Sequence, residues 1–361
     1  MDILGFGAAK PPYAITQREA AMLARAFCCQ TDEQARLLAA LYERTRVKER
    51  GSVLLETANG AGPRQTFFPP AAHPADRGPT TAERLRRYTQ DAPPLARAAS
   101  QQALRASGMA PRDLTQLITV SCTGLMAPGV DLRLIKDLGL DPNVGRTHIG
   151  FMGCHGALNA LRVASAFTGA DPSARVLVCA VELCSLHFQY GWDAESVVAN
   201  ALFADGAAAL VAAPAGSPSS AALRLVASGS CLIPGSEDAM TWQIGNYGFE
   251  MTLDAAVPDL IARSLRPWVV QWLAGQGLTL EQVGSWAVHP GGPRILASVA
   301  TGLGLPDHVL VASRTILAES GNMSSATVLF LLDHLLRQEA PRPYVALAFG
   351  PGLAAESALF V

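Results

Sequence analysis

The feature that most constrains this 361-residue chain is a weak internal repeat. Three short motifs recur in the same order at offsets of about 165 to 169 residues. Coincidence could explain one such match, but it explains three matches at similar offsets less well. They are Leu138-Gly139-Leu140 with Leu303-Gly304-Leu305, Asp113-Leu114 with Gln282-Val283, and Arg175-Val-Leu-Val with Arg342-Pro-Tyr-Val. The repeat predicts two related halves, residues 1–214 and 215–361, with a linker in the Pro/Gly/Ser/Ala-rich stretch at Pro214–Ser220.

The composition indicates a large buried core and excludes several classes of protein. Hydrophobic residues make up 50% and charged residues 16%, which is too apolar for a disordered chain. The formal charge of −2 gives no general attraction to nucleic acid or anionic membranes. No apolar run reaches the length of a membrane helix, and the first residues lack the features of a signal peptide. Seven cysteines without metal-type spacing indicate reduced thiols, so we expect a cytoplasmic protein without a metal. Its Arg and Ala richness is typical of high-GC bacterial genomes.

Local patterns predict an α/β fold. The first hundred residues are interpreted as helical, with capping boxes at Thr31–Gln34 and Thr80–Glu83 and a loop at Gly60–Pro79. Strands and helices then alternate, which favours α/β layers. The expected strands are Gln116–Ser121, Arg146–Phe151 and Arg175–Val181, and the expected helices are Asp131–Leu138, His155–Phe167 and Met323–Leu336.

Cys154 is the candidate nucleophile. It follows an apolar strand and a tight glycine turn, in Gly150-Phe-Met-Gly-Cys154-His-Gly, and it opens a helix. A helix N-terminus carries free amides and partial positive charge, which lower a thiol pKa and favour the thiolate. The alternative is a buried structural cysteine, which is the more common fate of this residue and fits most of the other six.

His289 and Asn322 are the candidate partners of Cys154. His289 ends a strand, in Trp286-Ala-Val-His289-Pro-Gly-Gly-Pro293, at the edge where α/β sites are built. Asn322 follows Ser320-Gly321 and opens an apolar helix, so it could equally be a helix cap. The repeat makes Cys154 and Asn322 begin equivalent helices, which would meet in one pocket. A thiol, an imidazole and an amide donor together can form an acyl thioester and stabilise an oxyanion.

In these and other motifs the chain resembles the type III polyketide synthases, the chalcone/stilbene synthase-like group of the thiolase fold. The matching motifs cover essentially the whole chain: Ala201-Leu-Phe203-Ala-Asp-Gly206, His289-Pro-Gly-Gly-Pro293, Gly321-Asn322-Met-Ser-Ser-Ala326 and Phe349-Gly350-Pro-Gly352. The resemblance implies a five-layered αβαβα arrangement of two duplicated halves, a homodimer, and acyl-CoA and malonyl-CoA as substrates without a metal or organic cofactor. It assigns the nucleophile to Cys154 and the decarboxylation pair to His289 and Asn322.

The resemblance also places binding residues. A gatekeeper aromatic falls on Phe203, whereas the second gatekeeper position falls on Met251, which is not aromatic and suggests a more adaptable passage. Ala127 aligns where a partner-subunit methionine reaches the cavity in plant members. The other expected cavity and motif residues are Cys122, Thr123, Cys184, His187, Trp242, Ser324, Phe349 and Gly350, and the expected CoA contacts are Arg44, Arg46, Lys48 and Arg50.

The function implied is iterative condensation of malonyl-CoA onto an acyl starter held on Cys154. The block Met240-Thr-Trp-Gln-Ile-Gly-Asn-Tyr-Gly-Phe249 resembles bacterial members that make alkylpyrones or alkylresorcinols. One alternative is an initiation-type 3-ketoacyl-ACP synthase of fatty-acid synthesis, which shares the fold and the three polar residues. The others are a Cys–His–Asn hydrolase, which the apolar repeated α/β pattern disfavours, and a non-catalytic relative that binds acyl chains.

Overall fold

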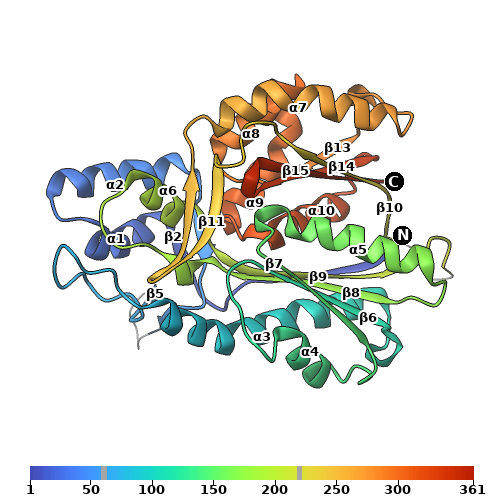
Figure 1. The fold of residues 1–361 in the computed structure, drawn as a ribbon, viewed down its shortest axis with the longest axis horizontal. Helices are drawn as coiled ribbons and strands as arrows, with labels where there is room; N and C mark the ends of the chain where they lie inside the picture. Colours follow the sequence, from blue (N-terminus) through green and yellow to red (C-terminus); the bar gives the residue numbers. More distant parts are fainter. Residues whose placement is uncertain (58–62, 218–221) are drawn as a thin grey trace.

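A nine-stranded sheet organises the protein, seen in a computed structural model that describes residues 1–57, 63–217 and 222–361 (Figure 1). The strand order is β13-β14-β15-β10-β1-β9-β8-β6-β7. The strands of the sheet are β1 (Asp2–Ala9), β6 (Gln116–Ser121), β7 (Gly145–Gly150), β8 (Val176–Leu183), β9 (Asp205–Ala213), β10 (Leu223–Leu232), β13 (Ser285–Val288), β14 (Tyr344–Gly350) and β15 (Ala354–Phe360).

The remaining elements are helices and three small two-stranded sheets. The helices are α1 (Gln17–Cys28), α2 (Asp32–Arg44), α3 (Thr81–Ser107), α4 (Val130–Leu138), α5 (Gly156–Ala170), α6 (Ala194–Leu202), α7 (Val257–Ala274), α8 (Pro293–Leu303), α9 (Val311–Ser320) and α10 (Thr327–Arg337). The small sheets pair β2 (Ala14–Thr16) with β3 (Glu49–Gly51), β4 (Glu56–Thr57) with β5 (Pro63–Arg64), and β11 (Met240–Gly245) with β12 (Gly248–Leu253).

The topology repeats in the two halves, as the sequence predicts. In the first half β1, β9 and β8 are antiparallel neighbours, and β6 lies parallel to β8. In the second half β10, β15 and β14 are antiparallel neighbours, and β13 lies parallel to β14. The first strands of the two halves, β1 and β10, pair antiparallel through Asp2 with Arg224 and join the halves into one sheet. The duplicated α/β arrangement is therefore confirmed.

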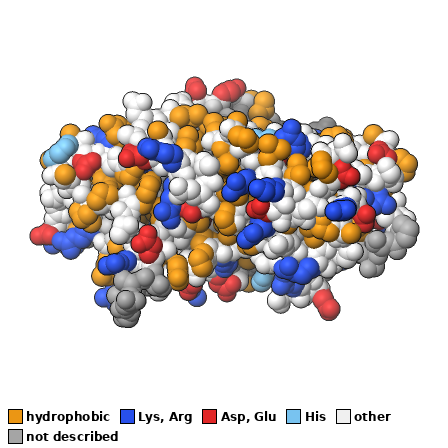
Figure 2. All heavy atoms as spheres, turned by 90° about the horizontal axis from the view of Figure 1, so that it is seen from below, with side chains coloured by type: hydrophobic (Ala, Val, Ile, Leu, Met, Phe, Trp, Pro, Cys, Tyr) orange, Lys and Arg blue, Asp and Glu red, His pale blue; other side chains and the backbone are white. Residues whose placement is uncertain are grey.

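The layers follow from alternation along the strands. Leu177 and Cys179 of β8 face the outer core between the sheet and α3. Val176 and Val178 face the central core that contains α5 and α10. On β14, Val345 faces the outer core under α7 and α8. Figure 1 shows α5 and α10 between the two parts of the sheet, with α7 and α8 above and α3 and α4 below. The outer face below, shown in Figure 2, interleaves basic, acidic and hydrophobic side chains.

Local sequence signals account for several element ends. Capping boxes begin α2 at Thr31 and α3 at Thr80. The side chain of each threonine accepts from the backbone amide three residues later, and the side chain of that later residue, Gln34 or Glu83, accepts from the threonine's own backbone amide. The repeated Leu-Gly-Leu motif ends α4 and α8, because Gly139 and Gly304 adopt left-handed φ values of 69° and 72°. The sequence repeat thus marks the same helix end in both halves.

Two expectations about secondary structure are wrong in part. The first hundred residues are not wholly helical, because residues 2–9 form the central strand β1. This strand is buried on both faces, so its Gly- and Ala-rich run shows no alternation that would distinguish it from a helix. The helix expected from Met323 begins only at Thr327, after a 3₁₀ turn at Ser324–Ala326. Residues 60–62 of the expected loop and 218–220 of the expected linker lie outside the described residues.

Candidate active site

Cys154 lies at a sharp corner between β7 and α5. The chain leaves β7, passes Phe151 at a φ of 57°, and enters a 3₁₀ turn at Gly153–His155 directly before α5. Gly153 has a φ of 63°, and a Cβ there would lie 2.4 Å from Cδ of Pro351 in the second half. Only glycine therefore fits this corner, which places the half-buried thiol at the start of a central helix.

Burial opposes ionisation of the Cys154 thiol. Burial raises the pKa of Cys154 to about 12, while hydrogen bonds from Ser324 and Asn322 act in the opposite direction. The lowered pKa expected from the helix start is not found, because desolvation of the thiolate outweighs the local hydrogen bonds. A base must therefore take the proton when the sulfur reacts.

Asn322 joins the two halves next to Cys154. Its backbone donates to the Leu202 carbonyl at 2.9 Å and accepts from Ala204 N at 2.9 Å, so the loop before α10 is fixed against the residues around Phe203. Its side-chain Oδ1 accepts from Ser324 N at 2.9 Å. Asn322 thus caps a turn, and its amide nitrogen remains as the donor toward the Cys154 sulfur.

His289 follows β13 and is 2% exposed. Its backbone donates to the Leu347 carbonyl at 2.8 Å, which holds it at the end of the β13–β14 pair. Neither ring nitrogen has a hydrogen-bond partner among the described residues. Burial, and next the charge of His155 beside Cys154, lower the pKa of His289 to about 3. The imidazole is therefore neutral and able to accept a proton or donate one hydrogen bond.

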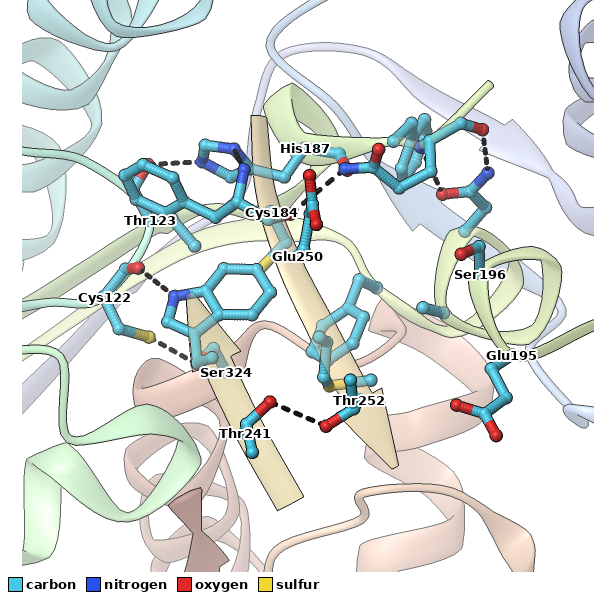
Figure 3. A pocket seen from close by; sticks show the side chains of 18 of the residues that line it. Cys122, Thr123, Cys184, His187, Glu195, Ser196, Thr241, Glu250, Thr252 and Ser324 are labelled. Carbon is cyan, nitrogen blue, oxygen red and sulfur yellow. Dashed lines mark hydrogen bonds between the residues drawn. The ribbon is translucent and has the colours of Figure 1, made fainter. Parts of the chain in front are cut away.

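Cys154 is one of the residues that line a cavity of about 450 Å³. Figure 3 shows its lining side chains coming from several separate elements, including both strands of the β11–β12 hairpin. The predicted residues that line it are Cys122, Thr123, Cys154, Cys184, His187, Phe203, Trp242, Met251 and Ser324. The structure therefore brings together most of the expected cavity residues, which lie far apart in the sequence.

Four predicted site residues lie behind the cavity surface rather than on it. His289, Asn322 and Phe349 are 2%, 1% and 4% exposed and do not line the cavity. Gly350 supports the site in another way, since a Cβ there would lie 2.4 Å from Cδ2 of His155. The glycine leaves room for the ring that follows the nucleophile.

Glu182 is a site residue that the sequence analysis missed. Its fully buried carboxylate accepts from Thr123 Oγ1 at 2.7 Å, from Cys122 N at 3.1 Å, and from the Ser325 hydroxyl. Burial raises the pKa of Glu182, and these hydrogen bonds oppose the rise. The one signal in the sequence was an acidic residue inside the apolar run Val176–Leu183, a position where an unpaired charge is not tolerated.

The predicted CoA contacts separate into two groups. Arg44, Arg46 and Lys48 are exposed, whereas Arg50 is 4% exposed. The Arg50 guanidinium donates to the carbonyls of Asn200 and Phe203 at 2.5 and 2.9 Å. A CoA contact by Arg50 does not fit this position, because its guanidinium is buried and its Nη1 already binds two carbonyls.

Metal sites and membrane-spanning helices are both absent from the described residues. Within residues 1–57, 63–217 and 222–361, no group of His, Cys, Asp and Glu side chains could hold a metal ion. None of the helices in these ranges is long and apolar enough to cross a membrane. The cytoplasmic location stays a prediction.

Sequence comparison relates both halves to one family. Residues 1–216 match the chalcone and stilbene synthases, N-terminal domain, and residues 224–361 match their C-terminal domain. The chain is 34% identical over 290 residues to an alpha-pyrone synthesis polyketide synthase-like protein of Mycobacterium tuberculosis, covering 78% of this chain and 73% of the relative. It is 37% identical over 270 residues to the 1,3,6,8-tetrahydroxynaphthalene synthase of Streptomyces peucetius, covering 73% and 72%.

Solved structures show the same fold. PKS-I from the brown alga Ectocarpus siliculosus superposes with a TM-score of 0.90 at 32% identity, over 99% of this chain and 97% of that one. The 1,3,6,8-tetrahydroxynaphthalene synthase of Streptomyces coelicolor, described as a bacterial type III polyketide synthase, superposes with a TM-score of 0.86 at 30% identity, over 100% and 99%. The predicted thiolase-like α/β fold is therefore confirmed.

Proposed function

Because the chain belongs to the chalcone and stilbene synthase family and is a type III polyketide synthase, an acyltransferase, we propose that Cys154, His289 and Asn322 carry its condensation reaction. The family membership disfavours the ketoacyl-ACP synthase, the hydrolase and the non-catalytic relative. The observations that support the proposal are a half-buried Cys154 thiol with the Asn322 amide as a donor beside it, and a buried His289 imidazole whose ring nitrogens have no partner among the described residues.

Starter loading begins with a neutral Cys154 thiol and a neutral His289 imidazole. His289 takes the proton of the Cys154 thiol as the sulfur attacks the thioester carbonyl of an acyl-CoA. The carbonyl C–S bond to CoA breaks, the CoA thiolate leaves and takes up a proton, and the acyl group stays on Cys154. Because burial keeps the resting pKa of Cys154 at about 12 and that of His289 at about 3, the transfer must be coupled to attack.

Extension uses malonyl-CoA. Loss of CO₂ breaks the bond to its carboxylate carbon and leaves the electron pair as an enolate, with negative charge on the thioester oxygen. An N–H of neutral His289 and the amide of Asn322 can donate to that oxygen. The carbanion then attacks the Cys154 thioester, a C–C bond forms, and the Cys154 sulfur leaves. Repetition lengthens a poly-β-keto chain that cyclises.

The product is proposed to be an alkylpyrone or an alkylresorcinol made from a medium- or long-chain fatty acyl starter. A second, mainly apolar hollow of about 40 Å³ lies on the other side of Phe188 and Phe203, which line both it and the main cavity. Each buried methylene adds about 0.8 kcal/mol, which favours longer starters until the space is full. The name of the Mycobacterium tuberculosis relative supports the pyrone.

The test is a series of acyl-CoAs from acetyl to palmitoyl, with coumaroyl-CoA alongside, incubated with malonyl-CoA and analysed by mass spectrometry. We expect kcat/KM to rise with chain length and Cys184→Phe to shift the preference to shorter starters, because Cys184 lines the cavity. Activity that peaks with malonyl-CoA alone or with an aromatic starter would contradict the alkyl proposal. The synthase assignment would remain.

A homodimer and a CoA entrance are also proposed. Strand β7 is the edge of the sheet, and the large apolar side chains of Leu125, Leu132 and Met152 are exposed. Such an edge and apolar surface favour pairing with a second copy, which light scattering would detect as twice the chain mass. Exposed Arg44, Arg46 and Lys48 are the candidates for the CoA phosphates, and their replacement by alanine should raise the KM for malonyl-CoA.

A further inference from the structure

The β11–β12 hairpin is a cavity wall that His187 fastens to the loop after β6. His187 Nε2 lies 2.7 Å from the Thr123 carbonyl oxygen, and the Phe249 amide lies 3.0 Å from His187 Nδ1. Because a carbonyl only accepts and an amide N–H only donates, the ring carries its proton on Nε2 and uses both nitrogens. Burial lowers the pKa of His187 to about 3, so this neutral form is the stable one.

Aromatic packing reinforces these hydrogen bonds. His187 is 5% exposed and stacks on Phe249, with 4.2 Å between ring centroids and 9° between planes. Trp242, on the opposite strand of the hairpin, meets both rings edge-on, and its Nε1 donates to the Cys122 carbonyl at 2.7 Å. Both hairpin strands are therefore tied to the two-residue segment Cys122–Thr123 (Figure 3).

The segment Cys122–Thr123 also contacts the catalytic corner. The Cys122 sulfur lies 3.0 Å from Ser324 Oγ, and the Ser324 hydroxyl forms a hydrogen bond with Cys154. Thr123 Oγ1 donates to buried Glu182 at 2.7 Å. A short chain of polar contacts therefore links the segment that anchors the hairpin to the nucleophile.

We propose that His187 is a positioning residue that sets the length of starter and product by clamping the β11–β12 hairpin at a fixed distance from Cys154. The inference rests on the proposed function, because it takes this cavity as the place where the acyl chain lies. The hairpin turn is tied separately to α3, where Gly248 N donates to Thr81 Oγ1 at 2.9 Å. Loss of the clamp therefore frees the Phe249 amide next to the turn, while the bonds of Gly248 and Trp242 still hold the hairpin.

The alternative is that His187 only fills space. His187→Phe separates the two possibilities, since phenylalanine is of similar size and can stack on Phe249 but offers no polar atom to Thr123 or Phe249. His187→Asn keeps an acceptor near the Nδ1 position, and His187→Gln keeps a donor near the Nε2 position. Ile244→Gln, on the same hairpin at a side chain 56% exposed, is the matched control.

The experiment measures hydrogen exchange of residues 240–253 without substrate, and the kcat/KM ratio of long to short acyl-CoA starters. For His187→Phe we expect at least tenfold faster amide exchange in the hairpin and at least a fivefold change in the ratio. His187→Asn and His187→Gln should give values between those of His187→Phe and those of the unmodified enzyme. Ile244→Gln should match the unmodified enzyme in both measurements.

His187→Phe that matches the unmodified enzyme in both measurements would overturn the clamp. If this variant does not fold, Trp242→Phe, which loses the bond to the Cys122 carbonyl, must still show faster hairpin exchange, and unchanged exchange would also overturn it. The exchange measurement needs no substrate, so a wrong starter class would leave it intact, and failure of the clamp is distinguishable from failure of the proposed function.

Discussion

The starts of the two central helices, α5 and α10, differ in what they present to the site. Gly153 and Ser324 both open a 3₁₀ turn with left-handed φ values, 63° and 46°, and a helix follows each turn. By this alignment Cys154 corresponds to Ser325, not to Asn322. The Cys154 thiol faces the cavity, whereas the Ser325 hydroxyl is bound to buried Glu182. The duplicated backbone thus supplies two equivalent positions, and side chains make one reactive and the other structural.

The ends of the equivalent strands β8 and β14 differ in the same way. Their registers with β6 and β13 make Val176 equivalent to Tyr344 and Glu182 equivalent to Gly350. The first half places a buried carboxylate there, and the second half a glycine that makes room for His155. The asymmetry of the site therefore arises from substitutions on a common scaffold.

The largest effect is expected when the thiol at the start of α5 is removed. Cys154→Ala removes the nucleophile, so we expect loss of condensation by about a thousandfold or more and no covalent acyl enzyme. Cys154→Gln should retain malonyl-CoA decarboxylation, because His289 and Asn322 remain. Mass spectrometry of the loaded enzyme would check both, and acyl adducts on Cys122 or Cys184 would contradict the assignment.

The two turns should also differ in tolerance of side chains. Gly153→Ala adds a Cβ at 2.4 Å from Pro351 and forces alanine into a left-handed conformation, which should cost about 3 kcal/mol of unfolding free energy. Ser324→Gly relieves the same conformation but loses the contact with Cys122, so the change should stay within about 1 kcal/mol. Urea denaturation measures both, and equal losses would contradict the expected difference in tolerance between the two turns.

Asn322→Asp distinguishes a cap from an oxyanion donor. Aspartate keeps the oxygen that accepts from Ser324 N, but it offers no donor and adds negative charge. We expect about a hundredfold slower malonyl-CoA decarboxylation, or about 2.7 kcal/mol on the barrier. Near-normal rates in a release assay for CO₂ would leave Asn322 as a cap alone.

The protonation of Cys154 can be measured by alkylation. Burial raises its thiol pKa to about 12, so the reactive thiolate fraction in the free enzyme increases about tenfold per pH unit from pH 7 to 9. The rate of iodoacetamide labelling at Cys154, followed by peptide mass spectrometry, should show that slope. A rate already constant near pH 7 would mean that the helix start lowers the pKa after all.

The smallest effect tests the repeat itself. Gly139→Ala and Gly304→Ala each place alanine in a left-handed helix end, at a cost of about 1 kcal/mol. A Cβ at Gly139 meets nothing within 4 Å, and at Gly304 it meets only the flexible end of Arg266 at 3.1 Å. The two losses in thermal denaturation should therefore be similar, and clearly unequal losses would contradict the equivalence of α4 and α8.

Much of the fold was predictable from local signals. The strand at Gln116–Ser121 matches β6 residue for residue, and the repeated Leu-Gly-Leu motif marks equivalent helix ends. The strand β1 was not predictable, because burial on both faces removes the alternation that identifies a strand. The 3₁₀ turn before α10 was missed because Ser324–Ala326 contains no proline or glycine that would separate it from the apolar helix that follows.

Most of the cavity lining was predictable in its residues, and the electrostatics of the thiol less so. The glycine turn before Cys154 matches the corner between β7 and α5, and the breaker-rich segment after His289 follows the end of β13. Glu182 was missed because its hydrogen-bond partners, such as Thr123 and Ser325, come from segments far away in the chain. Arg50 was misplaced, because an arginine among exposed basic residues gives no local sign that its guanidinium is buried.

The sequence by itself determined the duplicated α/β scaffold, the family, and the identity of the thiol, imidazole and amide, because these depend on local patterns and motifs. Only the tertiary structure decided that the Cys154 pKa is raised rather than lowered, and that His187 holds its proton on Nε2. Both depend on desolvation and on partners brought from distant segments, and these arise only when the two halves pack together.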